Sequence, residues 1–233
     1  MTPPTALVTG ASRGLGLALA TALSAQGWQL VLDARDGDRL AAAVAALPFP
    51  DLVTALPGDV ADPAHRAALA GAVPARLDLL VSNASDLGPS PLPRLADLPL
   101  GAFERVLAVN TVAPLALVQL LLPALRRAGG RVLQVSSDAA VEAYAGWGGY
   151  GASKAALDQL SGVLAVEEPG LRVYAVDPGD MATDLHQAAF PGEDVSDRPA
   201  PASVVPALLR LVAGELPSGR YRAAELAPAG ARA

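Results

Sequence analysis

The stretch Thr9-Gly10-Ala11-Ser12-Arg13-Gly14-Leu15-Gly16 decides how this chain folds. It follows the apolar run Ala6-Leu7-Val8, and a pattern of helical period continues after it from Leu17 to Gln26. A strand, a glycine-rich turn and a helix are therefore expected in direct succession. The glycines allow a tight turn and the close approach of a pyrophosphate, and a helix N-terminus offers free N–H groups to that anion. The stretch therefore predicts a dinucleotide-phosphate site.

Short apolar runs alternate with helical patterns along the whole chain, which is typical of βαβ units in a parallel sheet. No internal repeat or low-complexity linker interrupts them. The 233 residues therefore predict one α/β domain, a doubly wound parallel sheet of about seven strands with helices on both faces. Strands are expected at Ala6–Val8, Gln29–Leu32, Leu52–Leu56, Leu77–Val81, Arg131–Val135, Arg172–Val176 and Gly219–Ala223.

The composition limits the classes of function. Hydrophobic residues make up 52% of the chain and charged residues 17%, which excludes a disordered protein. The absence of cysteine excludes disulfides, thiolate nucleophiles and cysteine-based metal sites, and we expect no metal site. A net charge of −6 argues against nucleic acid or anionic membranes as partners. The first residues lack a secretory signal, so a cytoplasmic location is expected.

The segment Val106–Leu125 is as long and almost as apolar as a membrane-spanning helix. It contains Asn110, Pro114 and Gln119, however, which are disruptive or unfavourable in lipid. We therefore expect a long helix that is buried in the core or in a subunit interface.

Tyr150 and Lys154 stand four residues apart at a predicted helix start, on one helical face. Lys154 is the only lysine in the chain, although arginine is frequent. We expect the lysine charge to lower the pKa of the tyrosine from about 10 toward the working range of a general acid or base. The pair could then move a proton to or from a reacting oxygen.

The spacing T-G-x-x-x-G-x-G in residues 9–16, together with Y-x-x-x-K in residues 150–154, resembles the classical short-chain dehydrogenase/reductase family. The resemblance extends along nearly the whole chain. It implies a single Rossmann-type domain at residues 1–233 with a substrate lid at about 180–201. It also implies hydride transfer between a nicotinamide cofactor and a carbonyl or secondary alcohol. A small, largely apolar substrate is suggested separately by the apolar side chains expected around the site, although core packing would use the same residues: Leu87, Ala139, Val141, Tyr144 and Trp147.

The resemblance further implies a catalytic tetrad. Ser137 lies 13 residues before Tyr150, the spacing of the family, and is therefore chosen over Ser136. Ser137 and Tyr150 would hydrogen-bond the substrate oxygen, and Lys154 would hold the nicotinamide ribose. Asn110 would hold a water that links Lys154 to solvent. A role for Asn110 in bending or capping the helix is a compatible alternative.

The end of the second strand bears on the choice of cofactor. In the family, an acidic residue at the position of Ala34 selects NAD, whereas Arg35 and Arg13 here would bind the 2′-phosphate of NADP. NADP(H) is therefore preferred, with NAD(H) as the alternative if Asp33 engages the ribose. We favour Asp33 as part of a solvated strand end, and expect His65 on the surface.

Other positions carry the remaining cofactor contacts that the resemblance implies. Asp59 and Val60 would meet the adenine, unless Asp59 only caps the following helix. Thr183 would bond the carboxamide or a phosphate. Ser85 departs from the glycine usual beside the cofactor. The complete set is Gly10, Ser12, Arg13, Gly14, Leu15, Gly16, Arg35, Asp59, Val60, Asn83, Ala84, Tyr150, Lys154, Pro178, Gly179, Met181 and Thr183.

Two further hypotheses stay open beside an NADP(H)-dependent carbonyl reductase. One is an NAD-linked alcohol dehydrogenase of the same family. The other is a dinucleotide-binding regulator or scaffold without catalysis, which the complete tetrad disfavours. A homodimer or homotetramer is also predicted, because members of the family usually form helix-mediated dimers or tetramers and the apolar segment Val106–Leu125 could form such an interface.

Overall fold

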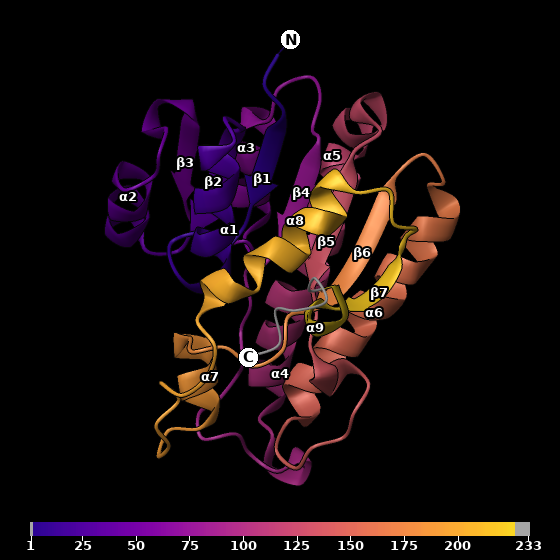
Figure 1. The fold of residues 1–233 in the computed structure, drawn as a ribbon. Coiled ribbons are helices and arrows are strands. Elements are labelled where there is room, and N and C mark those ends of the chain that lie inside the picture. Colours follow the sequence, from indigo (N-terminus) through magenta and orange to yellow (C-terminus); the bar gives the residue numbers. More distant parts are fainter. Residues whose placement is uncertain (1, 227–233) are drawn as a thin grey trace.

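A computed structural model describes residues 2–226 of the chain (Figure 1). Seven parallel strands form one sheet in the order β3-β2-β1-β4-β5-β6-β7. The strands are β1 (Thr5–Val8), β2 (Gln29–Ala34), β3 (Val53–Pro57), β4 (Leu79–Ser82), β5 (Arg131–Val135), β6 (Arg172–Asp177) and β7 (Gly219–Arg222). The predicted α/β fold and all seven predicted strands are confirmed.

The strand order reverses between β1 and β4. From β1 the chain builds outward to β2 and β3, and then returns to place β4 on the other side of β1. Parallel sheets bind ligands outside the carboxyl ends of the strands at such a point, because the connections diverge there and leave a crevice.

Strand alternation supplies both faces of the sheet with apolar side chains, as expected for a buried parallel sheet. In β1, Ala6 and Val8 belong to one core cluster and Leu7 to the other. The first cluster includes side chains of α1 (Gly14–Ala25) and α8 (Val205–Ala213), and the second includes side chains of α3 (Pro63–Ala72) and α5 (Ala113–Ala128). These helices therefore cover opposite faces of the sheet (Figure 1). The other helices are α2 (Gly37–Ala45), α4 (Leu100–Leu107), α6 (Gly148–Glu167), α7 (Asp184–Ala189) and α9 (Ala223–Leu226).

The predicted long helix is longer than expected and is not uniform. Helices α4 and α5 are joined by a π-helical turn, Ala108–Val112, which contains the fully buried Asn110. Residues 100–128 are long and apolar enough to span a membrane, but 44% of their apolar stretch is buried inside the protein. Leu117, Leu121 and Leu125 lie in the core beneath the sheet, which explains the apolar composition.

Candidate functional site

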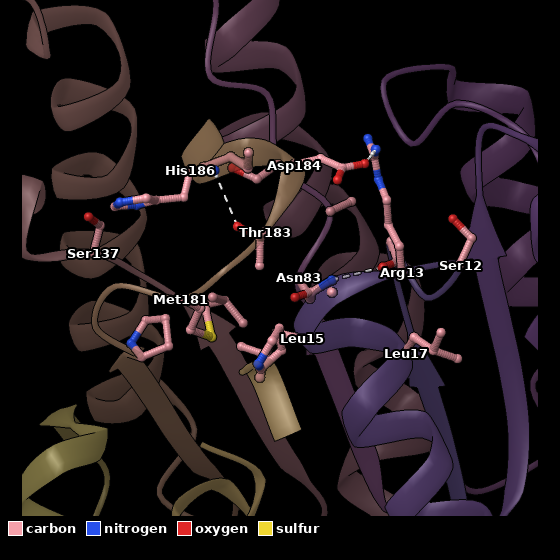
Figure 2. A pocket seen from close by; sticks show the side chains of 18 of the residues that line it. Ser12, Arg13, Leu15, Leu17, Asn83, Ser137, Met181, Thr183, Asp184 and His186 are labelled. Atoms are coloured by element: carbon pink, nitrogen blue, oxygen red, sulfur yellow. Dashed lines mark hydrogen bonds and ion pairs between the residues drawn. The ribbon is translucent and has the colours of Figure 1, made fainter. Parts of the chain in front are cut away.

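A cavity of about 860 Å³ opens at the carboxyl ends of the strands (Figure 2). It runs from the glycine-rich turn after β1 to Tyr150 and Lys154 on α6. All of the predicted site residues line it except Gly16 and Asn110. The cavity therefore brings together positions from one end of the chain to the other.

The turn between β1 and α1 depends on glycine at three positions. Gly10 and Gly14 adopt φ angles of +67° and +57°, which side chains other than glycine rarely adopt. Gly16 serves packing instead, because a Cβ atom there would lie 2.3 Å from Gly10 O and 2.5 Å from Asn83 Nδ2. This close approach explains why Gly16 lies behind the cavity wall.

Asn83 fastens the end of β4 to this turn. Its Nδ2 donates hydrogen bonds to Thr9 O at 2.9 Å and to Gly10 O at 3.0 Å. The Thr9 hydroxyl in turn accepts from the backbone N–H groups of Asn83 and Ala84. The two loops at the reversal point are therefore held as one unit, with Ala84 on the cavity wall.

Tyr150 and Lys154 are both buried and lie next to each other on α6. Lys154 Nζ lies 5.5 Å from the centre of the Tyr150 ring and donates a 2.7 Å hydrogen bond to Val135 O. Burial lowers the pKa of Lys154 to about 8. With this pKa, the buried amine of Lys154 can gain or lose its charge near neutral pH.

The expected lowering of the Tyr150 pKa is wrong for this structure. Burial raises the pKa of Tyr150 to about 12, although hydrogen bonds with Ser85 and Ser137 oppose the rise. Desolvation of the phenolate is the largest cause, and the negative charges of Asp138 and Asp177 raise the pKa further. Tyr150 is therefore a neutral phenol at pH 7, a proton donor.

Ser137 and Ser136 both line the cavity, but their hydroxyl groups differ in hydrogen bonding. The Ser137 hydroxyl lies in the cavity, donates to Asp138 Oδ1 at 2.9 Å and accepts from Ala139 N at 3.2 Å. Ser136 is 2% exposed, and its hydroxyl has no hydrogen-bond partner within residues 2–226. The neighbouring Asp138 orients the Ser137 hydroxyl, a contact that its spacing to Tyr150 did not reveal.

Asn110 bonds protein groups through both atoms of its amide. Its Oδ1 accepts from Asp86 N at 2.8 Å, and its Nδ2 donates to Asp86 O at 2.8 Å and to Ser153 Oγ at 3.0 Å. The Ser85 hydroxyl adds a 3.3 Å contact with Oδ1. Asn110 therefore fastens the loop after β4 to α6. The π-helical turn agrees with its predicted helix-bending role, and its water-holding role stays a prediction.

The end of the cavity beside β2 holds a hydrogen-bonded pair of side chains that the sequence did not predict. Asp33 is 1% exposed, and its carboxylate lies 2.6 Å from Nε2 of His65 on α3. The favoured solvated position for Asp33 and the surface position for His65 are both wrong, because each side chain buries the other. Arg35, by contrast, is exposed on the cavity wall as expected.

Asp59 also lies at this end, where Arg105 and the backbone hold it. Its carboxylate accepts from Arg105 Nη2 at 2.7 Å and from Ala61 N at 2.9 Å. Burial opposes ionisation, but these contacts outweigh it and lower the pKa of Asp59. The cap of α3 is Asp62, which accepts from Ala64 N, so the helix-capping alternative for Asp59 is wrong.

The segment after β6 folds over the cavity. Thr183 caps α7 by accepting a hydrogen bond from His186 N at 3.2 Å, and Arg13 of the glycine turn pairs with Asp184 of α7. Figure 2 shows this pair beside the cavity. Arg13 therefore fastens α7 to the turn, which sequence reasoning missed because the pair joins distant parts of the chain.

No cluster of three or more histidine, cysteine, aspartate or glutamate residues that could hold a metal occurs within residues 2–226. His186 is a further cavity residue that sequence reasoning missed. No motif marks it, because the segment after β6 has no clear periodicity.

Comparisons with known proteins agree with this architecture. Residues 4–194 match the family model described as short chain dehydrogenase. The rhamnolipids biosynthesis 3-oxoacyl-(acyl-carrier-protein) reductase of Pseudomonas aeruginosa is 37% identical over 189 residues, which cover 75% of this chain and 71% of that protein. A solved short chain dehydrogenase of Pseudomonas syringae is 31% identical with a TM-score of 0.87, covering 94% of both chains. One from Shigella flexneri, complexed with NADP, is 28% identical with a TM-score of 0.87, covering 96% of this chain and 98% of that one.

Proposed function

The chain belongs to the short chain dehydrogenase family of oxidoreductases, and on that premise we propose that it is an NADP(H)-dependent carbonyl reductase. The proposed enzyme is a single domain that reduces a carbonyl, or oxidises the matching secondary alcohol, of a small and largely apolar substrate. The observation that carries the proposal is the placement of Ser137, Tyr150 and Lys154 on one cavity with the glycine turn.

Different residues of the cavity have different roles in the proposed reduction. A bound nicotinamide supplies the hydride. Hydroxyl groups of Ser137 and Tyr150 hold the substrate oxygen, and Tyr150 donates the proton that the new alcohol needs. A pKa of about 12 keeps Tyr150 protonated at neutral pH, yet leaves it more acidic than an alcohol. Lys154 stabilises the phenolate that remains.

Three features support NADP(H) over NAD(H). Arg35 is exposed on the cavity wall, and among residues 2–226 it makes no ion pair that would occupy its guanidinium. The Asp33 carboxylate, which an NAD-linked enzyme could use on the ribose, is bound to His65. The solved relative from Shigella flexneri contains NADP. NAD(H) therefore becomes the weaker alternative.

Purified protein should oxidise NADPH in the presence of a panel of aryl and alkyl ketones, with kcat/KM at least about 10-fold lower for NADH. Replacing Arg35 with alanine should raise the KM for NADPH about 10-fold and leave that for NADH within about two-fold, because only NADPH carries the 2′-phosphate. Absorbance at the reduced nicotinamide band measures both. An unchanged NADPH preference in the Arg35→Ala variant would contradict the cofactor assignment, and no turnover of any carbonyl would favour the non-catalytic alternative.

We also propose a homodimer or homotetramer, as the apolar segment suggested. Five exposed apolar side chains lie on α5, α6 and the π-helical turn, namely Val112, Leu115, Leu120, Val163 and Val166. Sedimentation velocity should give at least twice the monomer mass, and Leu120→Asp should shift the mass toward 23.5 kDa. A monomer at micromolar concentration would contradict this oligomeric state.

The substrate lid at residues 180–201 and the cytoplasmic location of the protein stay predictions.

A further inference from the structure

One buried polar atom in the cavity has no function in the proposed hydride transfer. The His186 side chain is 9% exposed, and its Nε2 has no hydrogen-bond partner within residues 2–226. Leaving such a group buried and unpaired disfavours the folded state, because its hydrogen bond to water is lost without replacement. An unpaired polar atom on the wall of a binding cavity is therefore a candidate for contact with a ligand.

The imidazole is fixed in place and lies at the substrate end of the cavity. His186 lines the same cavity as Ser137 and Tyr150, and Figure 2 shows its ring extending from α7 toward the side where Ser137 lies. Its ring packs against Phe190 with 5.0 Å between ring centres, and Phe190 packs against Trp147 at 6.0 Å. These aromatic contacts restrain the ring and give the surroundings an apolar wall.

Helix α7, which carries His186, is attached to the body of the protein on both sides. Arg13 of the glycine turn pairs with Asp184 at its start. Near its end, the Ser90 hydroxyl donates a 2.7 Å hydrogen bond to Ala188 O. The position of His186 is therefore set by contacts with two loops that also border the cavity.

Charge around the imidazole favours a neutral ligand. Asp180 Oδ1 lies 3.7 Å from His186 Nδ1, and Asp138 lies beside Ser137 on the same cavity. The arginines that line the cavity are Arg13, Arg35, Arg39 and Arg105. In the neutral tautomer whose Nδ1–H faces the Asp180 carboxylate, Nε2 is a hydrogen-bond acceptor. An acceptor on a ring that also faces a carboxylate suits a hydroxyl group and disfavours a substrate carboxylate.

We propose that His186 selects the substrate, with its Nε2 accepting a hydrogen bond from a hydroxyl group close to the reacting carbonyl, as in an α-hydroxyketone. The identity of the reaction rests on the function proposed above, whereas the contact itself concerns binding. The aromatic wall formed by Trp147 and Phe190 would take the apolar substituent. In the oxidative direction the matching substrate is a vicinal diol.

Two ketones that differ by one hydroxyl test this contact. Calorimetry on the protein saturated with NADP⁺ should show 2-hydroxyacetophenone binding about 10-fold more tightly than acetophenone, and kcat/KM with NADPH should show the same preference. His186→Phe should remove the preference by weakening the hydroxyketone alone. His186→Gln should restore part of it, because its amide oxygen also accepts.

A measurement on the unaltered protein covers the case in which a variant misfolds. The chain has two histidines, so ¹⁵N-labelled imidazole signals can be resolved. The His186 Nε2 signal should move on addition of the hydroxyketone and stay in place with acetophenone. Absence of any preference between the ketones, an equal loss of both in His186→Phe, or a preference for the anionic benzoylformate would each overturn the inference. Hydroxyketone binding through His186 without NADPH oxidation would overturn the proposed reductase function alone.

Discussion

Replacing Tyr150 with phenylalanine should lower kcat for carbonyl reduction by about 10³-fold, the scale of a lost general acid. The variant keeps the ring that packs on Trp147, with 5.7 Å between ring centres, and removes only the hydroxyl. Ser137 is a poor substitute for this proton donor because its hydroxyl is far less acidic, and the Lys154 ammonium donates to Val135 O. The loss should therefore appear in the chemical step.

The effect on chemistry must be separated from an effect on binding. Single-turnover measurement with saturating NADPH should show the full loss of rate. Calorimetry should give an NADPH Kd within about two-fold of that of the unaltered protein. The proton transfer occurs only in the transition state, so removing it leaves cofactor binding in the ground state intact.

Tyr144 supplies the matched control for this variant. It is a nearby phenol, 43% exposed, whose hydroxyl donates to Glu142 Oε2 at 2.8 Å and lies 3.1 Å from Asp138 Oδ2. Tyr144→Phe should keep kcat within about three-fold, because surface phenols outside the reaction contribute little. A Tyr150→Phe enzyme with near-normal turnover, or equal losses in the two variants, would contradict the proton-donor role of Tyr150.

The sequence predicted the parts of this molecule that are local in the chain. The turn at residues 9–16 follows from glycine geometry and from the apolar runs on either side. The spacing of Ser137, Tyr150 and Lys154 predicted that these three side chains meet, and they line one cavity, because α6 starts soon after the loop that carries the serine. Both signals lie within short segments, where periodicity and backbone preference determine structure.

The features that sequence reasoning missed depend on contacts between distant segments. Asp33 and His65 come from β2 and α3, and nothing near either residue shows that they meet. The rise in the Tyr150 pKa likewise depends on burial by neighbours from several loops. The orientation of His186 depends on how α7 is fastened to the body, which no local pattern encodes.

Replacing Gly16 with alanine should lower the free energy of unfolding by about 3 kcal/mol, at the upper end of the range for overpacking in a rigid core. The added methyl group would lie 2.3 Å from Gly10 O, a backbone atom that cannot move without opening the turn. It would also lie 2.5 Å from Asn83 Nδ2, and would displace the amide from its bonds to Thr9 O and Gly10 O. The loss is therefore one of packing and of hydrogen bonds together.

Gly71 makes the comparison specific to the turn. It also lies in a helix, α3, and a Cβ atom there would meet nothing within 4 Å. Gly71→Ala should therefore raise the free energy of unfolding by about 0.5 kcal/mol, through the lower backbone entropy of the unfolded chain. Urea denaturation without cofactor measures both variants, and calorimetry with NADPH should show weaker binding in Gly16→Ala alone. Equal stabilities in the two variants would mean that β4 and the turn are not packed as closely as the structure has them. In that case Asn83 could not hold the two loops together, and the crevice at the reversal point would lack the rigidity that a fixed cofactor position requires.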